Sequence, residues 1–186
     1  MIRFATKQDA KAIAKLVLII LKDMELPFVQ QVGDQETISI LAEAVNDPTY
    51  RYGYQRGLVN EIDGQVAGVA FGYPSEDEPQ IDEAFSRVLL ARGMDDQRLF
   101  LDPETLPDEW YLDTICVDEK FRGQGVGSEL LDALPTIAQR EGKHRIGLCV
   151  DLANPNAQRL YERKGFVVVG QQVLSGHDYY HMQKKI

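Results

Sequence analysis

The stretch FRGQGVGSEL, residues 121–130, decides how the rest of the chain is interpreted. It places Gly123, Gly125 and Gly127 after Arg122 and leads into LLDALPTIAQREG, whose apolar spacing predicts a helix. A glycine-rich turn before a helix offers free backbone N–H groups and the positive end of the helix dipole, and the missing Cβ atoms let an anion come close. The stretch therefore predicts a phosphate-binding turn.

The spacing of the glycines in this turn limits which phosphate-containing ligands it could bind. A P-loop needs Lys followed by Ser or Thr after the last glycine, and here Ser128 and Glu129 follow Gly127. A dinucleotide fingerprint starting at Gly123 needs glycine at 128 and normally lies in the first βαβ unit of a chain. Asp151, at the end of the next predicted strand, keeps the dinucleotide interpretation open. A turn that only permits tight packing of strand and helix is the remaining alternative.

Predicted strands flank this turn and its helix. WYLDTICV (110–117) precedes the turn and HRIGLCVD (144–151) follows the helix, which predicts a βαβ unit. A further helix beginning near Asn154 and two strands, VVVGQQVL and DYYHMQKK, follow it.

The N-terminal half has a different order of elements. It predicts a strand at IRFAT, a helix that ends before Pro27, a helix from Asp34 to Val45 with Asp34 as its N-cap, and a hairpin of RGLVNEI and QVAGVAFGY around Asp63-Gly64. The fold class is α/β, or α+β in some classifications: a mixed, mostly antiparallel sheet with a central βαβ unit and helices on both faces.

An acidic segment, residues 74–109, interrupts this pattern between the third and fourth strands. It holds eleven acidic residues, Asp95 among them, against three arginines, and IDEAFSRVLLARG in its middle predicts a short helix. Long insertions of this kind are typical of lids or binding loops, and a mobile solvated loop is the alternative. We expect residues 1–186 to form a single domain that includes this insertion.

Composition excludes several classes of protein. The net charge of −9 disfavours nucleic-acid binding, which needs a basic face. The longest apolar run, LVLII, is far shorter than the roughly 20 residues of a membrane span, and MIRFATKQDAK lacks the pattern of a signal peptide, which favours a cytoplasmic protein without membrane contact. The only two cysteines, Cys116 and Cys149, lie in apolar strands without CxxC or histidine spacing, which predicts buried thiols and no metal site.

Two motifs together carry a resemblance to a known family. Arg122-Gly123-Gln124-Gly125-Val126-Gly127 is similar to the R/Q-x-x-G-x-G/A signature of GNAT-type N-acetyltransferases, which holds the pyrophosphate of acetyl-CoA. NPNAQRLYERKGF, residues 154–166, resembles that family's second motif, N-x-x-A-x-x-x-Y-x-x-x-G-F. The order of predicted elements fits as well, and the acidic segment 74–109 is the one departure.

The resemblance implies a set of cofactor-binding residues. Backbone amides of Arg122, Gly123, Gln124, Gly125, Val126, Gly127 and Ser128 would hold the pyrophosphate, with Arg122 adding a positive side chain. The backbone of Ile115, Cys116 and Val117 would face the pantetheine arm, because family members splay this strand from the next. Asn154 would orient the cofactor or the loop, or simply cap its helix.

The resemblance also implies the catalytic groups. Tyr161 lies where the family places a tyrosine beside the coenzyme sulfur, and a phenol can protonate the departing thiolate; packing on the core is the alternative role. Strand alternation puts Glu109, Tyr111 and Asp113 on one face, near the incoming amine. Asp113 and then Glu109 are the candidate general bases, Tyr111 is a candidate substrate contact, and an ion pair with a nearby arginine is the alternative for Asp113. His177 and His181 are expected to be surface or structural residues.

These residues predict an enzyme that transfers an acetyl group from acetyl-CoA to a primary amine of a small molecule or peptide by direct attack, with no metal. The acidic segment favours a cationic acceptor, such as a polyamine, an amino sugar or a lysine side chain. The alternatives are a non-catalytic acyl-CoA-binding sensor or partner-binding module, and a nucleotide-binding βαβ protein. A homodimer formed through the closing strands is an expectation from the family alone.

Overall fold

The computed structural model describes residues 1–94 and 96–186, so Asp95 lies outside the described residues. Its sheet has the strand order β1-β2-β3-β4-β5-β7-β6. The strands are β1 (Ile2–Phe4), β2 (Gly57–Ile62), β3 (Gln65–Pro74), β4 (Trp110–Val117), β5 (Arg145–Asp151), β6 (Val167–Leu174) and β7 (His177–Lys185). Among the strands of the described residues, β4 and β5 alone pair in parallel, which confirms the mixed, mostly antiparallel sheet around a βαβ unit.

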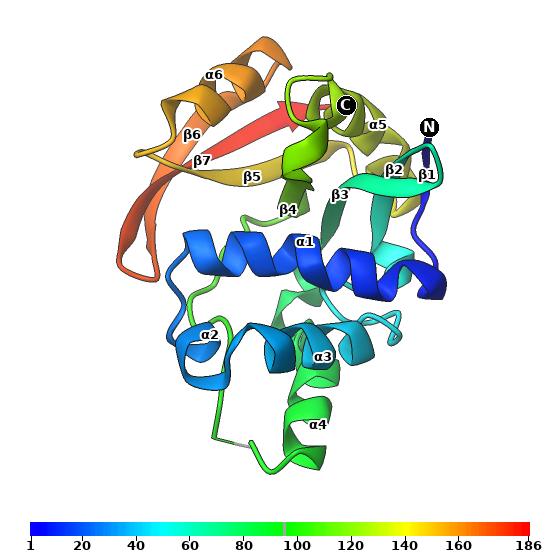
Figure 1. Ribbon diagram of the computed structural model, residues 1–186. Helices are drawn as coiled ribbons and strands as arrows, with labels where there is room; N and C mark the ends of the chain where they lie inside the picture. Colours follow the sequence, from blue (N-terminus) through cyan, green and yellow to red (C-terminus); the bar gives the residue numbers. More distant parts are fainter. Residues whose placement is uncertain (95) are drawn as a thin grey trace.

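Helices cover both faces of this sheet, as the sequence predicts. The α-helices are α1 (Ala10–Asp23), α2 (Pro27–Val32), α3 (Asp34–Ala44), α4 (Glu83–Ala91), α5 (Val126–Arg140) and α6 (Pro155–Arg163). Helices α1 to α4 gather in the lower part of Figure 1, and α5 and α6 lie at its top. Neighbouring residues of β2 separate the two cores, since Val59 packs with α1 and α3 whereas Leu58 packs with α5.

Two details of the N-terminal helices differ from the prediction. The N-cap of α3 is Gly33, with φ 86°, and Asp34 is already helical, so the assignment of Asp34 as the cap was wrong. The carboxylate of Asp34 instead accepts a hydrogen bond from Lys22 Nζ at 2.7 Å. The short helix α2 was not predicted, because Pro27 was taken only as a stop signal, whereas proline is also favoured in the first turn of a helix.

The hairpin and the acidic segment follow the prediction closely. Asp63 and Gly64 both have positive φ, 49° and 74°, as a tight two-residue turn between β2 and β3 requires. The predicted helix of the acidic segment is α4, which ends just before Gly93 at φ 69°. Phe85 and Leu89 of α4 are buried in the core that contains α1 and α3, so this part of the segment packs on the body of the protein.

The sheet opens at its centre. Parallel pairing of β4 with β5 is confined to Trp110–Leu112 opposite Ile146–Leu148, whereas β4 stays paired with β3 as far as Val117. The two strands therefore separate beyond Leu112 and leave a V-shaped opening beside the N-terminus of α5. No helix of the described residues is long and apolar enough to cross a membrane.

Candidate functional site

The glycine-rich turn has open space around it. Gly123 and Gly125 adopt φ of 75° and 85°, and a Cβ built on either would meet no atom within 4 Å. Glycine is thus needed here for its backbone conformation, and tight packing does not explain it. Gly125 is the N-cap of α5, so the first N–H groups of a 15-residue helix follow it directly. Arg122 Nε donates to Val117 O at 3.5 Å, which links the turn to the end of β4. These features suit an anion such as a pyrophosphate.

A cavity of about 150 Å³ lies between the strand β4 and the helix α6. Ile115 of β4 and Tyr161 of α6 line it, together with Asp113, Tyr111 and Cys149. The remaining lining residues are Ile20, Met24, Tyr52, Phe100, Glu104, Leu112, Thr114, Leu174 and Tyr179. The splayed part of β4, which the sequence assigned to the pantetheine arm, therefore forms one wall of this cavity. The side chain of Cys116 is buried with the core on the α1 side instead.

Tyr161 packs on the core and also faces the cavity. Its ring packs against Phe166 with centroids 6.0 Å apart, and its side chain lines the cavity. Burial raises the pKa of Tyr161 to about 12, so the phenol keeps its proton at neutral pH and can donate it. Asn154 caps α6, because its Oδ1 accepts a hydrogen bond from Ala157 N at 3.1 Å.

Asp113 forms an ion pair at the cavity wall. Its Oδ1 lies 2.6 Å from Nη1 of Arg51, and Asp82 binds the same guanidinium through Nε and Nη2, both at 2.8 Å. Arg51 is itself only 3% exposed and lies over the ring of Phe100, 4.0 Å from its centroid. Burial raises the pKa of the Asp113 carboxyl, although the Arg51 charge acts in the opposite direction.

A second carboxylate in the cavity comes from the acidic segment. Glu104 is 8% exposed, its Oε2 accepts a hydrogen bond from the Tyr111 hydroxyl at 2.9 Å, and its Oε1 lies 3.4 Å from Arg51 Nη1. Burial raises the pKa of Glu104 to about 7, with Arg51 opposing the shift and Asp113 adding to it. Sequence reasoning singled out neither Glu104 nor Arg51, because only the tertiary fold brings them beside Asp113.

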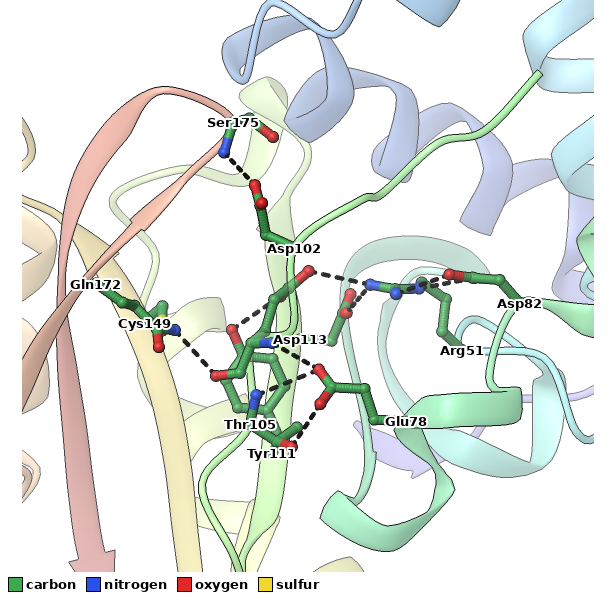
Figure 2. Close-up of polar contacts among 11 residues, drawn as sticks. Arg51, Glu78, Asp82, Asp102, Thr105, Tyr111, Asp113, Cys149, Gln172 and Ser175 are labelled. Atoms are coloured by element: carbon green, nitrogen blue, oxygen red, sulfur yellow. Dashed lines mark hydrogen bonds and ion pairs between the residues drawn. The ribbon is translucent and has the colours of Figure 1, made fainter. Parts of the chain in front are cut away.

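The chain around Glu104 is fixed from two sides (Figure 2). On one side, Glu78 accepts hydrogen bonds from Glu104 N at 2.7 Å and from Thr105 Oγ1 at 2.7 Å. On the other, Gln172 of β6 donates to Glu104 O at 3.0 Å, and Asp102 accepts from Ser175 N at 2.8 Å. We call residues 102–105 the strap. It ties the acidic segment to the β6–β7 hairpin across the cavity.

Glu109, the other predicted base, lies elsewhere. It precedes β4, is fully buried, and is absent from the cavity lining, so it does not join Asp113 and Tyr111 there. Its carboxylate accepts from Leu106 N at 2.8 Å and Gln183 Nε2 at 2.7 Å and lies 3.1 Å from His181 Nε2. Strict alternation does not hold along β4, because its pairing with β3 shifts register between Leu112 and Thr114, at Asp113. Three polar neighbours hold the Glu109 carboxyl beside β5 in a structural role, and His181 is buried with it.

Cys149 faces the same cavity from β5. Its Sγ lies 3.4 Å from His181 Nδ1 and accepts a hydrogen bond from Gln172 Nε2 at 2.8 Å. Burial raises the pKa of the Cys149 thiol to about 12, so it is neutral at physiological pH. Among the described residues, no group of histidine, cysteine and acidic side chains is arranged to hold a metal ion.

Comparison with known proteins gives a consistent result. A model of the acetyltransferase (GNAT) family matches residues 24–166. A crystal structure of an acetyltransferase is 58% identical, with a TM-score of 0.93 over 100% of this chain and 99% of that one. An N-acetyltransferase from Staphylococcus aureus Mu50 is 31% identical, with a TM-score of 0.87 over 99% of this chain and 100% of that one. Both relatives span the acidic segment as well.

Curated relatives match over shorter stretches. The [ribosomal protein bS18]-alanine N-acetyltransferase of Haemophilus ducreyi is 37% identical over 79 residues, which are 42% of this chain and 52% of that protein. The chain spans about half the length, or less, of the curated relatives it matches.

Proposed function

The chain belongs to the acetyltransferase (GNAT) family, whose members use acetyl-CoA, and from this premise we propose that it transfers an acetyl group from acetyl-CoA to a primary amine by direct attack of the amine nitrogen. The observation that carries the proposal is the end of the β4–β5 pairing at Leu112, because beyond it Ile115 of β4 and Cys149 of β5 line the same cavity as Tyr161. We further propose that residues 1–186 act as one domain, with the acidic segment as a wall of the site.

The residues around the opening between β4 and β5 fit acetyl-CoA. The backbone from Arg122 to Ser128 would hold the pyrophosphate at the start of α5, where open space and positive φ at Gly123 and Gly125 permit close approach. The backbone from Ile115 to Val117, unpaired on the β5 side, would bind the pantetheine arm. Asn154 would hold the start of α6 and thereby Tyr161. When bound, acetyl-CoA supplies an activated acetyl thioester.

The chain's own residues would then position the amine and move protons. Tyr161, neutral at physiological pH, would donate a proton to the thiolate sulfur that departs from the acetyl carbon. Asp113, ion-paired with Arg51, lines the cavity, and the Tyr111 hydroxyl fixes a second carboxyl group there, that of Glu104. Catalysis by this arrangement rests mainly on positioning.

The acceptor is proposed to be a cationic amine. Phe100 separates the cavity from a wider pocket of about 660 Å³ that four acidic residues line: Glu78, Asp82, Glu83 and Asp102. Two of the arginines in that pocket, Arg51 and Arg87, are ion-paired with Asp82 and Asp47. A positively charged acceptor would therefore approach through a wall with excess carboxylate. The similarity to an enzyme named for a ribosomal-protein alanine adds the N-terminus of a peptide to the classes to be tested.

Calorimetric titration with CoA, acetyl-CoA and NAD tests the proposal first. We expect both forms of the coenzyme to bind and NAD not to bind. The Gly125→Val variant should lose this affinity, because valine strongly disfavours φ of 85° and its side chain would occupy the space of the phosphates. Gly142→Val is the matched control, since Gly142 has φ 73° and equally open surroundings at the other end of α5.

An amine screen with acetyl-CoA then separates an enzyme from a sensor. The screen contains spermidine, glucosamine, a lysine-containing peptide and a peptide with N-terminal alanine, with aspartate as the anionic comparison. Acetylation of cationic amines supports the proposal, and acetylation of aspartate alone would reject the cationic class. Binding of CoA without turnover of any amine would instead favour the non-catalytic sensor, and NAD binding without CoA binding would favour a nucleotide-binding protein.

A further inference from the structure

We propose that Glu104 is the group that takes the proton from the acceptor ammonium, delivered into the cavity by the strap, residues 102–105. This inference rests on the proposed function, and it assigns the proton acceptor to the acidic segment and not to β4. Glu104 lines the same cavity as Tyr161 and Ile115, so it faces the space where an amine must meet the thioester. Its side chain is 10% exposed, which leaves it accessible from that space.

Charge balance around Arg51 explains why Glu104 can hold a proton. One buried guanidinium faces three carboxylates, from Asp82, Asp113 and Glu104. Asp82 binds it with two hydrogen bonds of 2.8 Å and Asp113 with one of 2.6 Å, whereas Glu104 lies 3.4 Å away. One carboxylate is enough to balance the single positive charge of Arg51, so three carboxylates leave surplus negative charge in a buried site, and Glu104 is the one farthest from the guanidinium. Of the three carboxyl groups around Arg51, that of Glu104 is therefore the one expected to take up and release a proton most readily.

The other groups that face Glu104 agree with this assignment. From β4, the Tyr111 hydroxyl donates to Oε2 at 2.9 Å and fixes the direction of the carboxyl. The remaining charged or titratable neighbours are Asp113 of β4, Tyr73 of β3, Cys149 of β5, Tyr179 of β7 and Glu78 of the 3₁₀ turn Ser75–Gln80. Burial is the largest cause of the raised pKa of Glu104; Asp113 and Glu78 raise this pKa further, whereas Arg51 and the hydrogen bond from Tyr111 lower it.

The strap gives this side chain a fixed position although it belongs to a long insertion. Glu78 binds the backbone N of Glu104, and Gln172 of β6 binds its backbone O. A carboxyl held by its own main chain from both sides loses little conformational freedom when an amine arrives. Burial of a surplus carboxylate is unfavourable, so a loop without a role in the site would be expected to leave this glutamate exposed to solvent.

The proton balance of the reaction is complete with these groups. An acceptor ammonium carries three protons, and the product amide carries one. Glu104 takes one proton before attack and releases it to solvent. The amine nitrogen then forms a bond to the acetyl carbonyl carbon, the carbon–sulfur bond breaks, and the sulfur takes a proton from Tyr161. The phenolate regains that proton from the nitrogen of the new amide.

Two measurements test the assignment. The first is the pH profile of kcat with the amine that the screen identifies. Wild type should show a rise with pH whose apparent pKa is near 7, the value to which burial raises the pKa of Glu104. Glu104→Gln should lower kcat by about 10²-fold and lose this rise, as removal of a general base does. Its affinity for CoA should be unchanged, since the turn at 121–128 is not altered.

Glu141→Gln is the matched control. It makes the same substitution at an exposed glutamate beyond the C-terminal end of α5, where Glu141 pairs with Arg140 and lines neither the cavity nor the acidic pocket. It should keep the rise in kcat near pH 7. A Glu104→Gln enzyme that keeps both its rate and this rise would overturn the inference while leaving the acetyltransferase proposal intact.

The second measurement does not depend on turnover. Carbon-13 NMR of protein labelled at the glutamate carboxyl carbons should show one resonance that titrates near pH 7 in wild type and in Glu141→Gln, and that is missing in Glu104→Gln. A Glu104 carboxyl that titrates near the ordinary glutamate value of about 4.3 would overturn the inference, even for a protein that acetylates none of the amines.

Discussion

At the scale of single residues, Tyr161 is the group whose role a conservative change isolates. Tyr161→Phe keeps the ring that packs on Phe166 and removes only the hydroxyl. We expect kcat to fall by about 10²-fold with the KM for acetyl-CoA nearly unchanged, because the phenol acts only on the departing sulfur. Steady-state kinetics with the best amine measures this. Burial raises the pKa of Tyr161 to about 12, so the loss should be the same at every pH between 6 and 9.

Tyr180→Phe is the control for that change. Tyr180 packs in the same apolar core as Tyr161 but does not line the cavity. Its hydroxyl should be dispensable. Equal rates for Tyr161→Phe and wild type would show that Tyr161 only packs, which is the alternative that the sequence leaves open.

Residues differ in how far the sequence can assign them. The glycines at 123 and 125 and the tyrosine at 161 lie in contiguous motifs, so local spacing and the family resemblance are enough to select them. Arg51 and Glu104 lie in segments without such a motif, and they become part of the site only when β2 and β4 pair with β3 and the strap crosses the cavity. Asp113 could be selected by its strand, but its ion-pair partner 62 residues away could not.

At the scale of elements, the junction of β4 and β5 depends on a glycine. A Cβ on Gly147 of β5 would overlap the carboxylate of the buried Glu109. We expect Gly147→Ala to lower the free energy of unfolding by about 3 kcal/mol, because the methyl group must displace a buried carboxyl group that is hydrogen-bonded to Leu106, Gln183 and His181. Urea denaturation followed by circular dichroism measures the change.

Gly170→Ala on β6 is the matched control. A Cβ at Gly170 would meet nothing within 4 Å, so the same substitution in another strand should change the free energy of unfolding by less than about 0.5 kcal/mol. Similar losses for the two variants would mean that glycine at 147 has no special relation to Glu109.

Elements were predicted well where their signals are periodic or local. The Asp-Gly hairpin, the βαβ unit and α4 of the acidic segment all match, since each is encoded by turn chemistry or helical spacing within a short window. The short α2 was missed because six residues give too little periodicity. The separation of β4 from β5 was predicted from the family resemblance, because no side-chain pattern in either strand indicates it.

At the scale of the whole molecule, the site is assembled from segments distant in sequence. Arg51 precedes β2, Asp113 is on β4, and Gln172 lies on β6 at the other side (Figure 2). Glu104, in the strap, contacts both Arg51 and Gln172. The acidic segment is thus part of the site's wall, and both solved relatives span it. Because these contacts connect both halves of the chain, we expect the protonation of Glu104 to affect the stability of the entire fold.

The stability of the protein should therefore fall as pH rises from 5 to 8. Burial raises the pKa of Glu104 from 4.5 to about 7, so the folded protein holds a proton that the unfolded chain releases in this range. The stabilisation is complete below pH 4.5 and is lost as pH passes about 7, and 1.36 kcal/mol per pKa unit makes it roughly 3 kcal/mol. The raised pKa of Asp113 acts in the same direction.

Comparison with Glu104→Gln isolates this contribution. Carboxyls with lowered pKa, such as Asp9, Asp47 and Glu76, stabilise the fold throughout this range and lose that contribution only at more acidic pH, so they do not mask the effect between pH 5 and 8. The uncharged glutamine cannot titrate, and every other group is common to both proteins. The difference in the free energy of unfolding, variant minus wild type, should therefore grow by up to roughly 3 kcal/mol from pH 5 to pH 8, measured by urea denaturation at each pH. A difference that stays constant with pH would mean that Glu104 is already ionised in the folded protein at pH 5. In that case the surplus of carboxylates around Arg51 does not raise the pKa of Glu104, and the argument for its role as proton acceptor fails.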